Sequence, residues 1–488
     1  MNVIKNFAEK GLSFHQNNKF TDAKKQYLEV LKLDPKNFQI KRLLALVEFS
    51  LENYENSLTL LNECIKEKSN YSEAYCDRGM VNYKIRNINK AEEDYLKSIS
   101  IDNNLNALYN YGNLLKDKKL YNDALSYYDR AIEGNPNFLK AYQNRAYVNF
   151  IQNRDRDALR DFNKLLQFNP NNHDARFFKS SIELKNGDLI EGFKNYEIRW
   201  KSSNFPTKKK IFEGKVWDGK DDLKNKTILL YSEQGLGDQI QFIRFAYLIL
   251  NKGAEVIIEV DKRLVGLLKE TTNFKNIYQT NEKLPKYEFN CPIMSLPYKL
   301  KIDLNSIPNK PYLKSDKRTI NKWKNLFSDK FFNIGINWQG GIDPRQDFGR
   351  SFNIDYFEKI SKIKNVKLFS LQKINGLDQI ENRKNNFNLN IIDNMDIDNP
   401  FVDTAAIISN LDLVITSDTS IAHLSGALGK KTFLLLQKFS EWRWFKNRND
   451  SPWYESIKIF RQNTEDQWDD VFLSVEKELI NSNEILQN

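Results

Sequence analysis

The chain has 488 residues, of which 40% are hydrophobic and 13% are aromatic. A chain of this length exceeds a single hydrophobic core, and its apolar content argues against wholesale disorder. The net charge of +10 comes from basic and acidic residues that are mixed along the chain, so it does not indicate a nucleic-acid partner. We therefore expect a globular protein of roughly two to four domains.

No targeting or membrane-spanning segment is expected. No apolar run approaches the ~20 residues that a membrane span needs, and the first residues, Met1 to Asn6, lack the apolar stretch of a signal peptide. The cysteines Cys64, Cys76 and Cys291 are too few and too scattered for a disulfide framework or a zinc cluster. We expect a cytoplasmic protein, with a peripheral association with the inner membrane as the alternative.

A period of about 34 residues runs through the first part of the chain. Small residues recur at one position of the period, and aromatic or large apolar residues follow four positions later: Ala23, Ser57, Ala91, Ala124, Ala158 and Gly192, then Tyr27, Leu61, Tyr95, Tyr128, Phe162 and Tyr196. The small residues let paired helices approach closely, and the large ones fill the space between neighbours. The pattern resembles the tetratricopeptide repeat, which implies an all-α solenoid of about six repeats over residues 1–200.

Polar residues stand at the sixth position of several successive repeats. They are Asp77, Asn110 and Asn144. In tetratricopeptide-fused sugar transferases, which these repeats resemble, asparagines at this position grip an extended peptide backbone, because an amide both donates and accepts hydrogen bonds. We predict these three residues as candidate peptide-binding residues, and the repeats as a device that recruits a polypeptide acceptor or a protein partner.

The periodicity changes after residue 200. Residues 201–225 are polar and lysine-rich, with Trp217 as an apolar anchor, and are predicted to be a linker. Short β-rich runs then alternate with helical patterns, which is typical of doubly wound parallel sheets. The predicted strands are residues 227–231, 255–260, 333–338, 366–371, 411–416 and 432–436. We expect two α/β domains, over residues 226–315 and 330–480.

A turn rich in glycine follows the first predicted strand and ends in a carboxylate. It reads Glu233-Gln234-Gly235-Leu236-Gly237-Asp238, and Ile240 stands where a dinucleotide fingerprint needs its third glycine, which disfavours an NAD-dependent sugar epimerase. Asp238 opens a predicted helix, where it can cap the helix or accept a proton from an incoming hydroxyl. We predict Asp238 as a catalytic base, with capping alone as the alternative, and Gln234, Gly235 and Gly237 as the acceptor-side loop.

A second turn, Asp418-Thr419-Ser420, follows the strand predicted at 411–416. Hydroxyls and backbone N–H groups at a helix start can hold a diphosphate. His423, one of only three histidines in the chain, lies one turn further on. We predict contact between His423 and a ligand, with a histidine of the core as the alternative.

The two turns and several further segments share a specific resemblance. The segments are 233–242, 403–406 with 418–429, 334–340, 370–373, 442–444 and 451–454. They resemble the tetratricopeptide-linked relatives of bacterial heptosyltransferases, in the expected order along essentially the whole chain. The resemblance implies a GT-B architecture of two Rossmann-like domains, with the donor nucleotide bound mainly by the C-terminal one, and transfer without an essential metal.

The same resemblance assigns roles by position. Asp238 resembles the general base, and Asp418, Thr419, Ser420 and His423 match the segment that binds the donor diphosphate. Lys373 and Arg350 are candidate cations for the leaving phosphates, with exposed surface charges as the alternative. The chain departs from its relatives at Gly341-Ile342-Asp343, where an Asn-Pro is expected after Gly340.

A D-x-D triplet occurs at Asp396-Ile397-Asp398, and such triplets bind manganese in other sugar transferases. It lies in an Asn/Asp-rich stretch ahead of Pro400, where turn chemistry is a sufficient explanation. No metal site is therefore expected, and no cofactor other than a nucleotide-diphospho-sugar as co-substrate.

Together these features predict a metal-independent, inverting glycosyltransferase, hexosyl- or heptosyltransferase-like, that transfers a sugar to a hydroxyl of a protein or glycan. Such chemistry needs positioning and charge stabilisation more than a reactive cofactor. The alternative is a tetratricopeptide scaffold or adaptor whose glycosyltransferase-like domain is catalytically silent, because a fold does not imply an activity.

Overall fold

A computed structural model of the chain describes residues 2–341, 349–382 and 387–481. Ile342 and Asp343, where the sequence departs from its relatives, lie outside the described residues. The chain divides into two compact units, residues 1–175 and 176–488. Within the described ranges, no helix combines the length and the apolar character that crossing a membrane requires.

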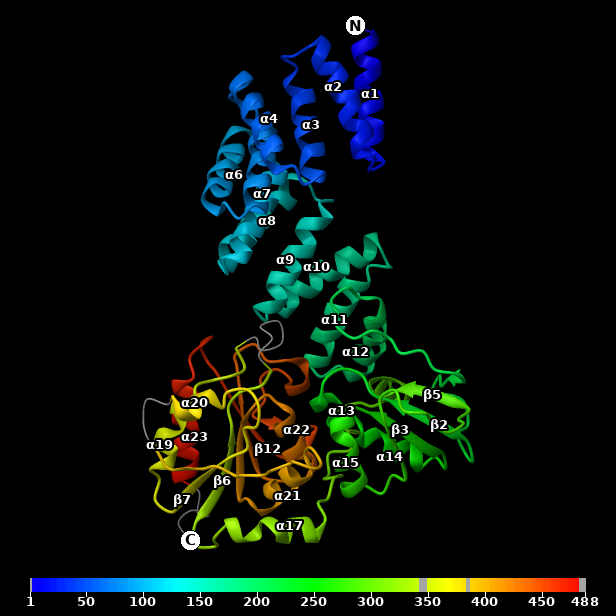
Figure 1. Cartoon of the computed structure of the whole chain (residues 1–488), viewed down its shortest axis with the longest axis vertical. Helices are drawn as coiled ribbons and strands as arrows, with labels where there is room; N and C mark the ends of the chain where they lie inside the picture. Colours follow the sequence, from blue (N-terminus) through cyan, green and yellow to red (C-terminus); the bar gives the residue numbers. More distant parts are fainter. Residues whose placement is uncertain (1, 342–348, 383–386, 482–488) are drawn as a thin grey trace. The chain divides into compact units, whose positions relative to one another are not determined.

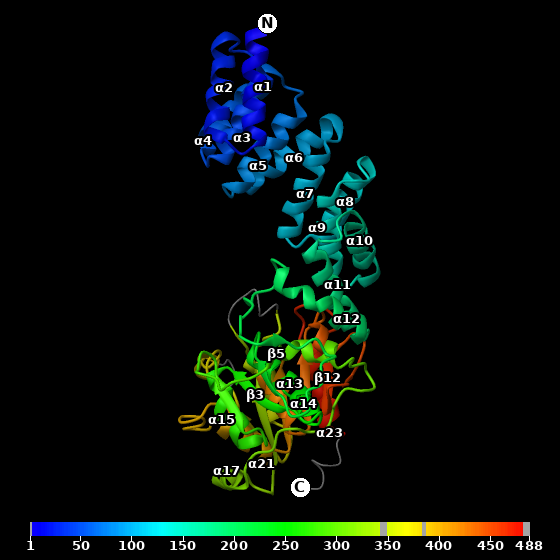
Figure 2. The ribbon, with the colours of Figure 1, turned by 90° about the vertical axis from the view of Figure 1, so that its right-hand side faces the viewer.

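The first unit consists of helices that pack in antiparallel pairs, drawn in blue to cyan in Figure 1 and from a second side in Figure 2. The helices are α1 (Asn2–Gln16), α2 (Phe20–Leu33), α3 (Phe38–Ser50), α4 (Tyr54–Glu67), α5 (Ser72–Lys84), α6 (Ile88–Asp102), α7 (Leu105–Asp117), α8 (Tyr121–Gly134), α9 (Leu139–Ile151) and α10 (Asp155–Phe168). Each pair is one repeat of the predicted solenoid.

Glycines in the first helix of a pair lie directly against the predicted aromatic residues of the second helix. A Cβ atom added to Gly11 would lie 2.6 Å from Cε1 of Tyr27, and one added to Gly79 would lie 2.7 Å from the same atom of Tyr95. Both tyrosines are buried. The repeat period therefore encodes the close approach of the two helices in a pair, because only a residue without a side chain fits beneath the ring.

The second unit begins with the helices of the sixth repeat. α11 (His173–Lys185) crosses the boundary at residue 175, and α12 (Leu189–Tyr196) and the 3₁₀ helix η1 (Glu197–Lys201) follow. The apolar side chains of α12 belong to the same buried cluster as the strands that come later. Trp217, in the predicted linker, is 1% exposed in this cluster. The segment before the sheets is thus part of the core of the second unit.

The first sheet of this unit is parallel, with the strand order β1-β5-β2-β3-β4. Its strands are β1 (Lys215–Val216), β2 (Thr227–Tyr231), β3 (Glu255–Val260), β4 (Asn276–Gln279) and β5 (Phe289–Pro292), and its helices are α13 (Leu236–Phe242), α14 (Arg244–Leu250), α15 (Lys262–Thr271) and α16 (Leu296–Lys299). After β2 the chain adds β3 and β4 on one side of this strand and then β5 on its other side. The direction of winding therefore reverses between β2 and β5.

The second sheet has the order β11-β12-β10-β9-β6-β7-β8 and is parallel except for the pair β11–β12. Its strands are β6 (Phe332–Asn337), β7 (Val366–Ser370), β8 (Leu389–Asn390), β9 (Leu413–Ser417), β10 (Thr432–Leu436), β11 (Asp450–Ser451) and β12 (Tyr454–Arg461), and its helices are α17 (Lys317–Trp323), α19 (Glu358–Ser361), α20 (Asp378–Glu381), α21 (Val402–Asn410), α22 (Ser420–Ala427) and α23 (Asp469–Ile480). Here the winding reverses between β6 and β9.

All six predicted strands are present, each within two residues of its predicted ends. The sheets confirm the predicted α/β class. β12 escaped prediction because Glu455, Lys458 and Arg461 interrupt its apolar residues. An edge-side strand whose outward positions are charged carries a weaker signal than a strand buried on both faces.

The two sheets share one buried core. α13 of the first sheet packs against α22 of the second, and both helices lie between the sheets in Figure 1. Arg244 of α14 is 1% exposed and donates hydrogen bonds to the carbonyls of Gln241, Pro308 and Trp453. This buried guanidinium joins the first sheet, the connecting segment and the second sheet.

Candidate functional site

Both turns singled out in the sequence lie at the carboxyl ends of central strands. The turn at 232–238 follows β2, and Asp418 follows β9. Each strand borders the point where its sheet reverses winding. In open α/β sheets, ligands bind outside the carboxyl ends of the strands at these reversal points. The positions of both turns therefore match that of a ligand site.

Asp238 makes two separate interactions. Its Oδ2 accepts a hydrogen bond of 2.9 Å from the backbone N–H of Gly235, so it caps the start of α13. Its Oδ1 forms an ion pair with Nη2 of Arg443, and the side chain is 16% exposed. Asp238 therefore caps the helix, as the alternative interpretation of the sequence expected, but capping uses only one of its two carboxylate oxygens.

The groups around Asp238 shift its pKa in opposite directions. Burial raises the pKa of Asp238, and the charge of Arg443 acts in the opposite direction, while Glu441 raises the pKa further. A carboxylate with a raised pKa is a better proton acceptor than one in water. The basicity of Asp238 therefore depends on where the Arg443 guanidinium lies.

Gly237 and His423 form the contact between α13 and α22. A Cβ atom on Gly237 would lie 2.7 Å from Cδ2 of His423. The His423 ring stacks on Trp444 at a centroid distance of 5.0 Å, and its Nδ1 lies 3.0 Å from the Tyr454 hydroxyl. Burial, and to a lesser degree Arg443 and Arg244, lower the pKa of His423. His423 is therefore a neutral ring in the wall between the sheets.

Thr419 and Ser420 begin α22. Thr419 is the N-cap: its Oγ1 accepts a hydrogen bond from the N–H of Ile421 and donates one of 2.9 Å to Oδ1 of Asn337. Ser420, the first residue of the helix, is partly exposed. The hydroxyl of Thr419 is thus directed toward the end of β6, and Ser420 opens the first turn of α22.

Asp418 lies among charged groups. Burial raises the pKa of Asp418 to about 6 and Glu441 raises it as well, whereas Arg350 and Arg443 favour the charged form. Nη1 of Arg350 donates a hydrogen bond of 3.1 Å to the backbone carbonyl of Asp418. The predicted Arg350 and Asp418 are therefore neighbours, and Arg443 acts on both carboxylates of the site.

Arg443 and Arg461 are site residues that were not predicted from the sequence. Burial lowers the pKa of Arg461 to about 10, and the charge of Asp418 partly offsets this effect. Nη2 of Arg461 donates to the carbonyl of Phe445 at 3.0 Å. Arg443 lies inside the Trp442–Trp444 segment, and the resemblance of this segment to the transferases could have indicated it. Arg461 is the last residue of β12, a strand that was not predicted.

Three buried polar atoms near Asp418 make no hydrogen bond to any described residue. They are Nε of Arg443, Nε1 of Trp444 and Oγ of Ser417, in residues that are at most 6% exposed. The indole of Trp444 lies toward Asp418 without hydrogen-bond geometry. Because buried polar atoms are normally paired, their gathering indicates a place for a polar ligand.

The sixth repeat supports the turn at 232–238. Nε2 of Gln234 donates to the Tyr196 hydroxyl at 3.1 Å, and Oε1 of Gln234 accepts from Nη2 of Arg443 at 2.9 Å. The buried Glu233 accepts two hydrogen bonds of 2.8 Å from Arg199 of η1. The residues that hold the turn thus come from the end of the helical repeats as well as from the second sheet.

Lys373 and Asp396 lie in a separate arrangement. Nζ of Lys373 donates to the carbonyls of Met395 and Asp396, at 3.0 Å each, so it holds this loop instead of contacting Asp418. Asp396 accepts hydrogen bonds from the N–H and the hydroxyl of Thr404 at the start of α21. The first carboxylate of the D-x-D triplet is therefore bound to the first turn of α21. In the part of the chain that the structure describes, no cluster of three or more His, Cys, Asp or Glu residues suits a metal ion.

The predicted peptide-binding residues lie on the first helices of successive repeats in the first unit. Asp77 is paired with Nε of Arg42 at 2.5 Å, and burial raises its pKa. The amide of Asn144 donates to the Tyr109 hydroxyl at 3.1 Å, and that of Asn110 points to the Cys76 sulfur at 3.7 Å. Each side chain links its helix to the previous repeat.

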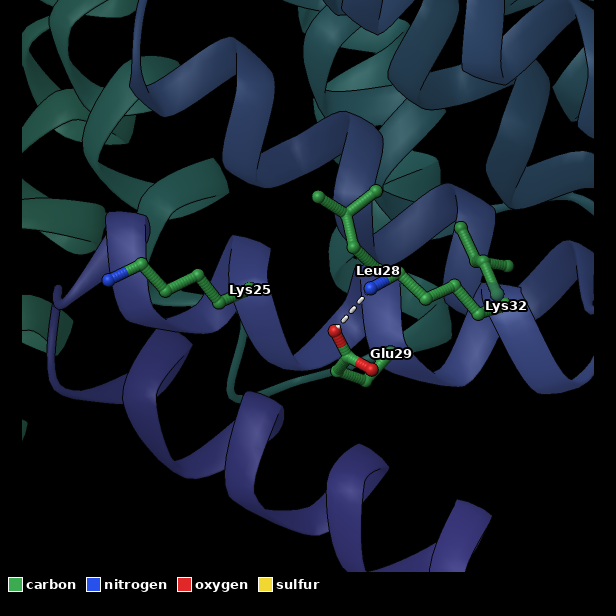
Figure 3. A pocket seen from close by; sticks show the side chains of 5 residues that line it. Lys25, Leu28, Glu29 and Lys32 are labelled. Atoms are coloured by element: carbon green, nitrogen blue, oxygen red, sulfur yellow. Dashed lines mark hydrogen bonds and ion pairs between the residues drawn. The ribbon is translucent and has the colours of Figure 1, made fainter.

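A pocket in the first unit lies on α2 and involves none of the predicted site residues. Figure 3 shows Lys25, Leu28, Glu29 and Lys32, which line it together with Leu31. Lys32 and Glu29 form an ion pair of 2.7 Å across it. One face of a single helix supplies all these side chains, so the pocket has no convergent polar groups from other elements.

The tetratricopeptide repeat family matches residues 9–72, 72–105 and 105–138. The repeats of the first unit are therefore tetratricopeptide repeats. The crystal structure of MamA, a solved structure, is 21% identical with a TM-score of 0.29, over 34% of this chain and 91% of that one.

Two curated relatives extend the comparison. Protein FlbA of Caulobacter vibrioides is 24% identical over 369 residues, which are 69% of this chain. This chain covers 60% of the length of FlbA. The UDP-N-acetylglucosamine–peptide N-acetylglucosaminyltransferase of Giardia intestinalis is 42% identical over 77 residues, which are 16% of this chain and 5% of that protein.

Proposed function

We propose that this chain is a glycosyltransferase of the GT-B type that moves a sugar from a nucleotide-diphospho-sugar to a hydroxyl of a protein or glycan acceptor. The observation that carries the proposal is the position of Asp238 and Asp418. Each follows a strand at the reversal point of its own sheet, and Arg443 acts on both carboxylates. Because open α/β sheets bind ligands at such reversal points, two sheets of this kind can hold a donor and an acceptor.

The proposed chemistry is a single displacement without a metal. Asp238 accepts the proton of the acceptor hydroxyl as its oxygen bonds to the anomeric carbon and the bond to the diphosphate breaks. Arg350, Arg443 and Arg461 stabilise the charge of the departing diphosphate. Ser420 and the first N–H groups of α22 contribute further donors, as helix starts do for phosphates.

The remaining predicted residues have supporting parts in this proposal. Neutral His423 keeps α22 in contact with Gly237, and Thr419 caps the helix that faces the diphosphate. Lys373 holds the loop at Met395. Inversion at the anomeric carbon follows from attack on the face opposite the diphosphate.

The repeats are proposed to recruit the acceptor or a partner. Tetratricopeptide repeats form extended surfaces that suit protein binding, and this chain has them over residues 9–138. The printed name of the Giardia relative describes transfer to a peptide. This short similarity favours a polypeptide as the acceptor, with Asp77, Asn110 and Asn144 as the candidate contacts.

The substitution Asp238→Asn tests the proposal. It keeps the shape of the side chain but removes the proton acceptor, so turnover is expected to fall by at least about 100-fold. Nucleotide binding, measured by calorimetry with UDP-, GDP-, dTDP- and ADP-sugars, should remain. Asp450→Asn, in a surface pair with Arg448, is the matched control and should keep full turnover. Unchanged turnover in Asp238→Asn would remove Asp238 from its role.

A second candidate function is that of an adaptor with a silent transferase-like unit. The specific observation in its favour is that Thr419, His423 and Lys373 all make interactions within the chain. The same calorimetry separates the two functions, because an adaptor should bind none of the nucleotide sugars.

A further inference from the structure

Arg443 joins the two halves of the site. Its Nη2 forms an ion pair with Oδ1 of Asp238 and donates a hydrogen bond of 2.9 Å to Oε1 of Gln234, so both partners come from the turn after β2. Its Nη1 pairs with Glu441, and its guanidinium lies over the Trp442 ring at 4.4 Å. The side chains of Arg443 and Asp238 are 7% and 16% exposed, so their ion pair lies largely out of water, whereas Glu441 is 60% exposed.

The same guanidinium also has an N–H group that is not paired with the first sheet. Its Nε is buried and has no hydrogen-bond partner among the described residues, as is the case for Nε1 of Trp444. Its charge also stabilises ionised Asp418, at the start of α22. A buried N–H without a partner costs free energy, and an anionic oxygen is the ligand that would satisfy it best.

We propose that Arg443 moves its charge from Asp238 to the donor diphosphate, so that Asp238 becomes an effective base only when the donor is bound. The inference rests on the proposed glycosyltransferase function. It makes Arg443 a residue that contacts the co-substrate, and it implies that the donor binds before the acceptor reacts.

The charged groups around Asp238 determine in which direction its pKa shifts when the diphosphate binds. Arg443 is the cation that faces it, Glu441 is the nearby anion, and the neutral ring of His423 approaches from α22. When a diphosphate shares the Arg443 guanidinium, Asp238 keeps its burial and loses part of its counter-charge. Its pKa therefore rises, and its affinity for the acceptor proton rises with it.

The atoms and electrons of the proposed transfer step balance within the site. The acceptor proton passes to Oδ1 of Asp238, the acceptor oxygen bonds to the anomeric carbon, and the electron pair of the broken bond stays on the diphosphate, beside Arg443, Arg350 and Arg461. After the nucleoside diphosphate leaves, Arg443 pairs with Asp238 again, and the carboxyl group releases its proton to water.

Proton uptake on ligand binding tests the exchange without an activity assay. The full chain is titrated with UDP, GDP, dTDP and ADP at about pH 6, in two buffers of different ionisation enthalpy, and the difference in heat gives the protons bound. The wild-type protein should take up more protons than Asp238→Asn with the same nucleotide. Contributions from Asp418 and from the ligand itself cancel in this comparison.

Arg443→Gln provides the second measurement. Without its counter-charge, buried Asp238 has a higher pKa and binds more of its proton before the ligand arrives, so the excess uptake should shrink, and nucleotide affinity should fall by about 10- to 100-fold. Arg443→Lys keeps the charge without the fork of the guanidinium and should retain part of the uptake. This variant replaces Arg443→Gln if the Gln variant folds poorly. Arg448→Gln, a surface arginine paired with Asp450, is the matched control and should match the wild-type protein.

The outcomes separate the two proposals. Equal proton uptake in the wild-type protein and Asp238→Asn, with nucleotide bound by both, overturns the exchange and leaves the glycosyltransferase proposal standing. If none of the four nucleotides binds the wild-type protein, the glycosyltransferase proposal fails, and the exchange fails with it.

Discussion

Asp418 lies where burial and the nearby Glu441 disfavour its charge, and its pKa rises from 3.8 to about 6. Between these two values the folded protein binds more protons than the unfolded chain, so its stability falls as the pH rises through this window. Above about pH 6 the ionised carboxylate costs the folded state on the order of 3 kcal/mol. A functional site tolerates such a cost when the charge or its protonation has a use.

The substitution Asp418→Asn should remove this cost. At about pH 8 the variant is expected to be more stable than the wild-type protein by up to about 3 kcal/mol, and the difference should shrink toward zero below about pH 4. Urea unfolding followed by tryptophan fluorescence measures it, because all eight tryptophans lie after residue 175 and report on the second unit.

Asp450→Asn is the control for this comparison. The pKa of Asp450 is lowered by its hydrogen bond with Arg448, so its substitution should not stabilise the protein at high pH. A loss of stability in Asp418→Asn at about pH 8 would contradict the account of Asp418.

At the scale of elements, η1 and the turn after β2 depend on one buried ion pair. Arg199 is fully buried and donates to both oxygens of Glu233, and also to the Ser295 hydroxyl at 2.9 Å. Burial raises the pKa of Glu233, and Arg199 counteracts this. Glu233 opens the turn that ends in Asp238, so the pair connects the last repeat to the proposed base.

Arg199→Met should leave Glu233 buried without its counter-charge. The expected loss of stability of the second unit is about 3–5 kcal/mol, because removal of one partner of a buried pair leaves an uncompensated charge. The double variant Arg199→Met/Glu233→Gln should recover part of the loss. Tryptophan-monitored urea unfolding measures both.

Arg263→Met is the matched control, because Arg263 forms a more exposed pair with Asp261. Its loss should not exceed about 1 kcal/mol. If Arg199→Met were as stable as Arg263→Met, the pair would not hold the turn.

At the scale of the whole molecule, the division at residue 175 assigns the sixth repeat to the second unit. Leu189, Phe193 and Tyr196 of α12 are at most 2% exposed and belong to the cluster that also contains the strands of both sheets. A boundary drawn from the repeat period, at residue 200, would cut through this core.

Two truncated chains test this division. Residues 176–488 should unfold cooperatively, whereas residues 201–488 should lose α12 and Arg199 and be much less stable or insoluble, because several fully buried side chains each contribute about 1.5–3 kcal/mol. Thermal unfolding by tryptophan fluorescence compares the two. Equal stability would place the boundary at residue 200, as the sequence predicts.

Much of the architecture was predictable from local patterns. The burial of Tyr95 follows from its place in the repeat period, and β2 and β9 are apolar runs between turn residues. The turn of Asp238 and the cap of α22 are also local, because capping involves residues within one turn of a helix. β12 and Arg461 were not predictable in this way, since charged residues mask the strand.

The tetratricopeptide repeats, six of the strands of the α/β region and the two turns at strand ends follow from the sequence alone, because periodicity and capping act over a few residues. Only the tertiary structure brought Arg443 to Gln234 and Asp238, across a separation of 209 residues between Arg443 and Gln234. That contact depends on how α13 packs against α22, and Gly237 permits it by leaving room for His423. Packing between distant elements follows from the shape and burial of the whole core, which no local pattern encodes.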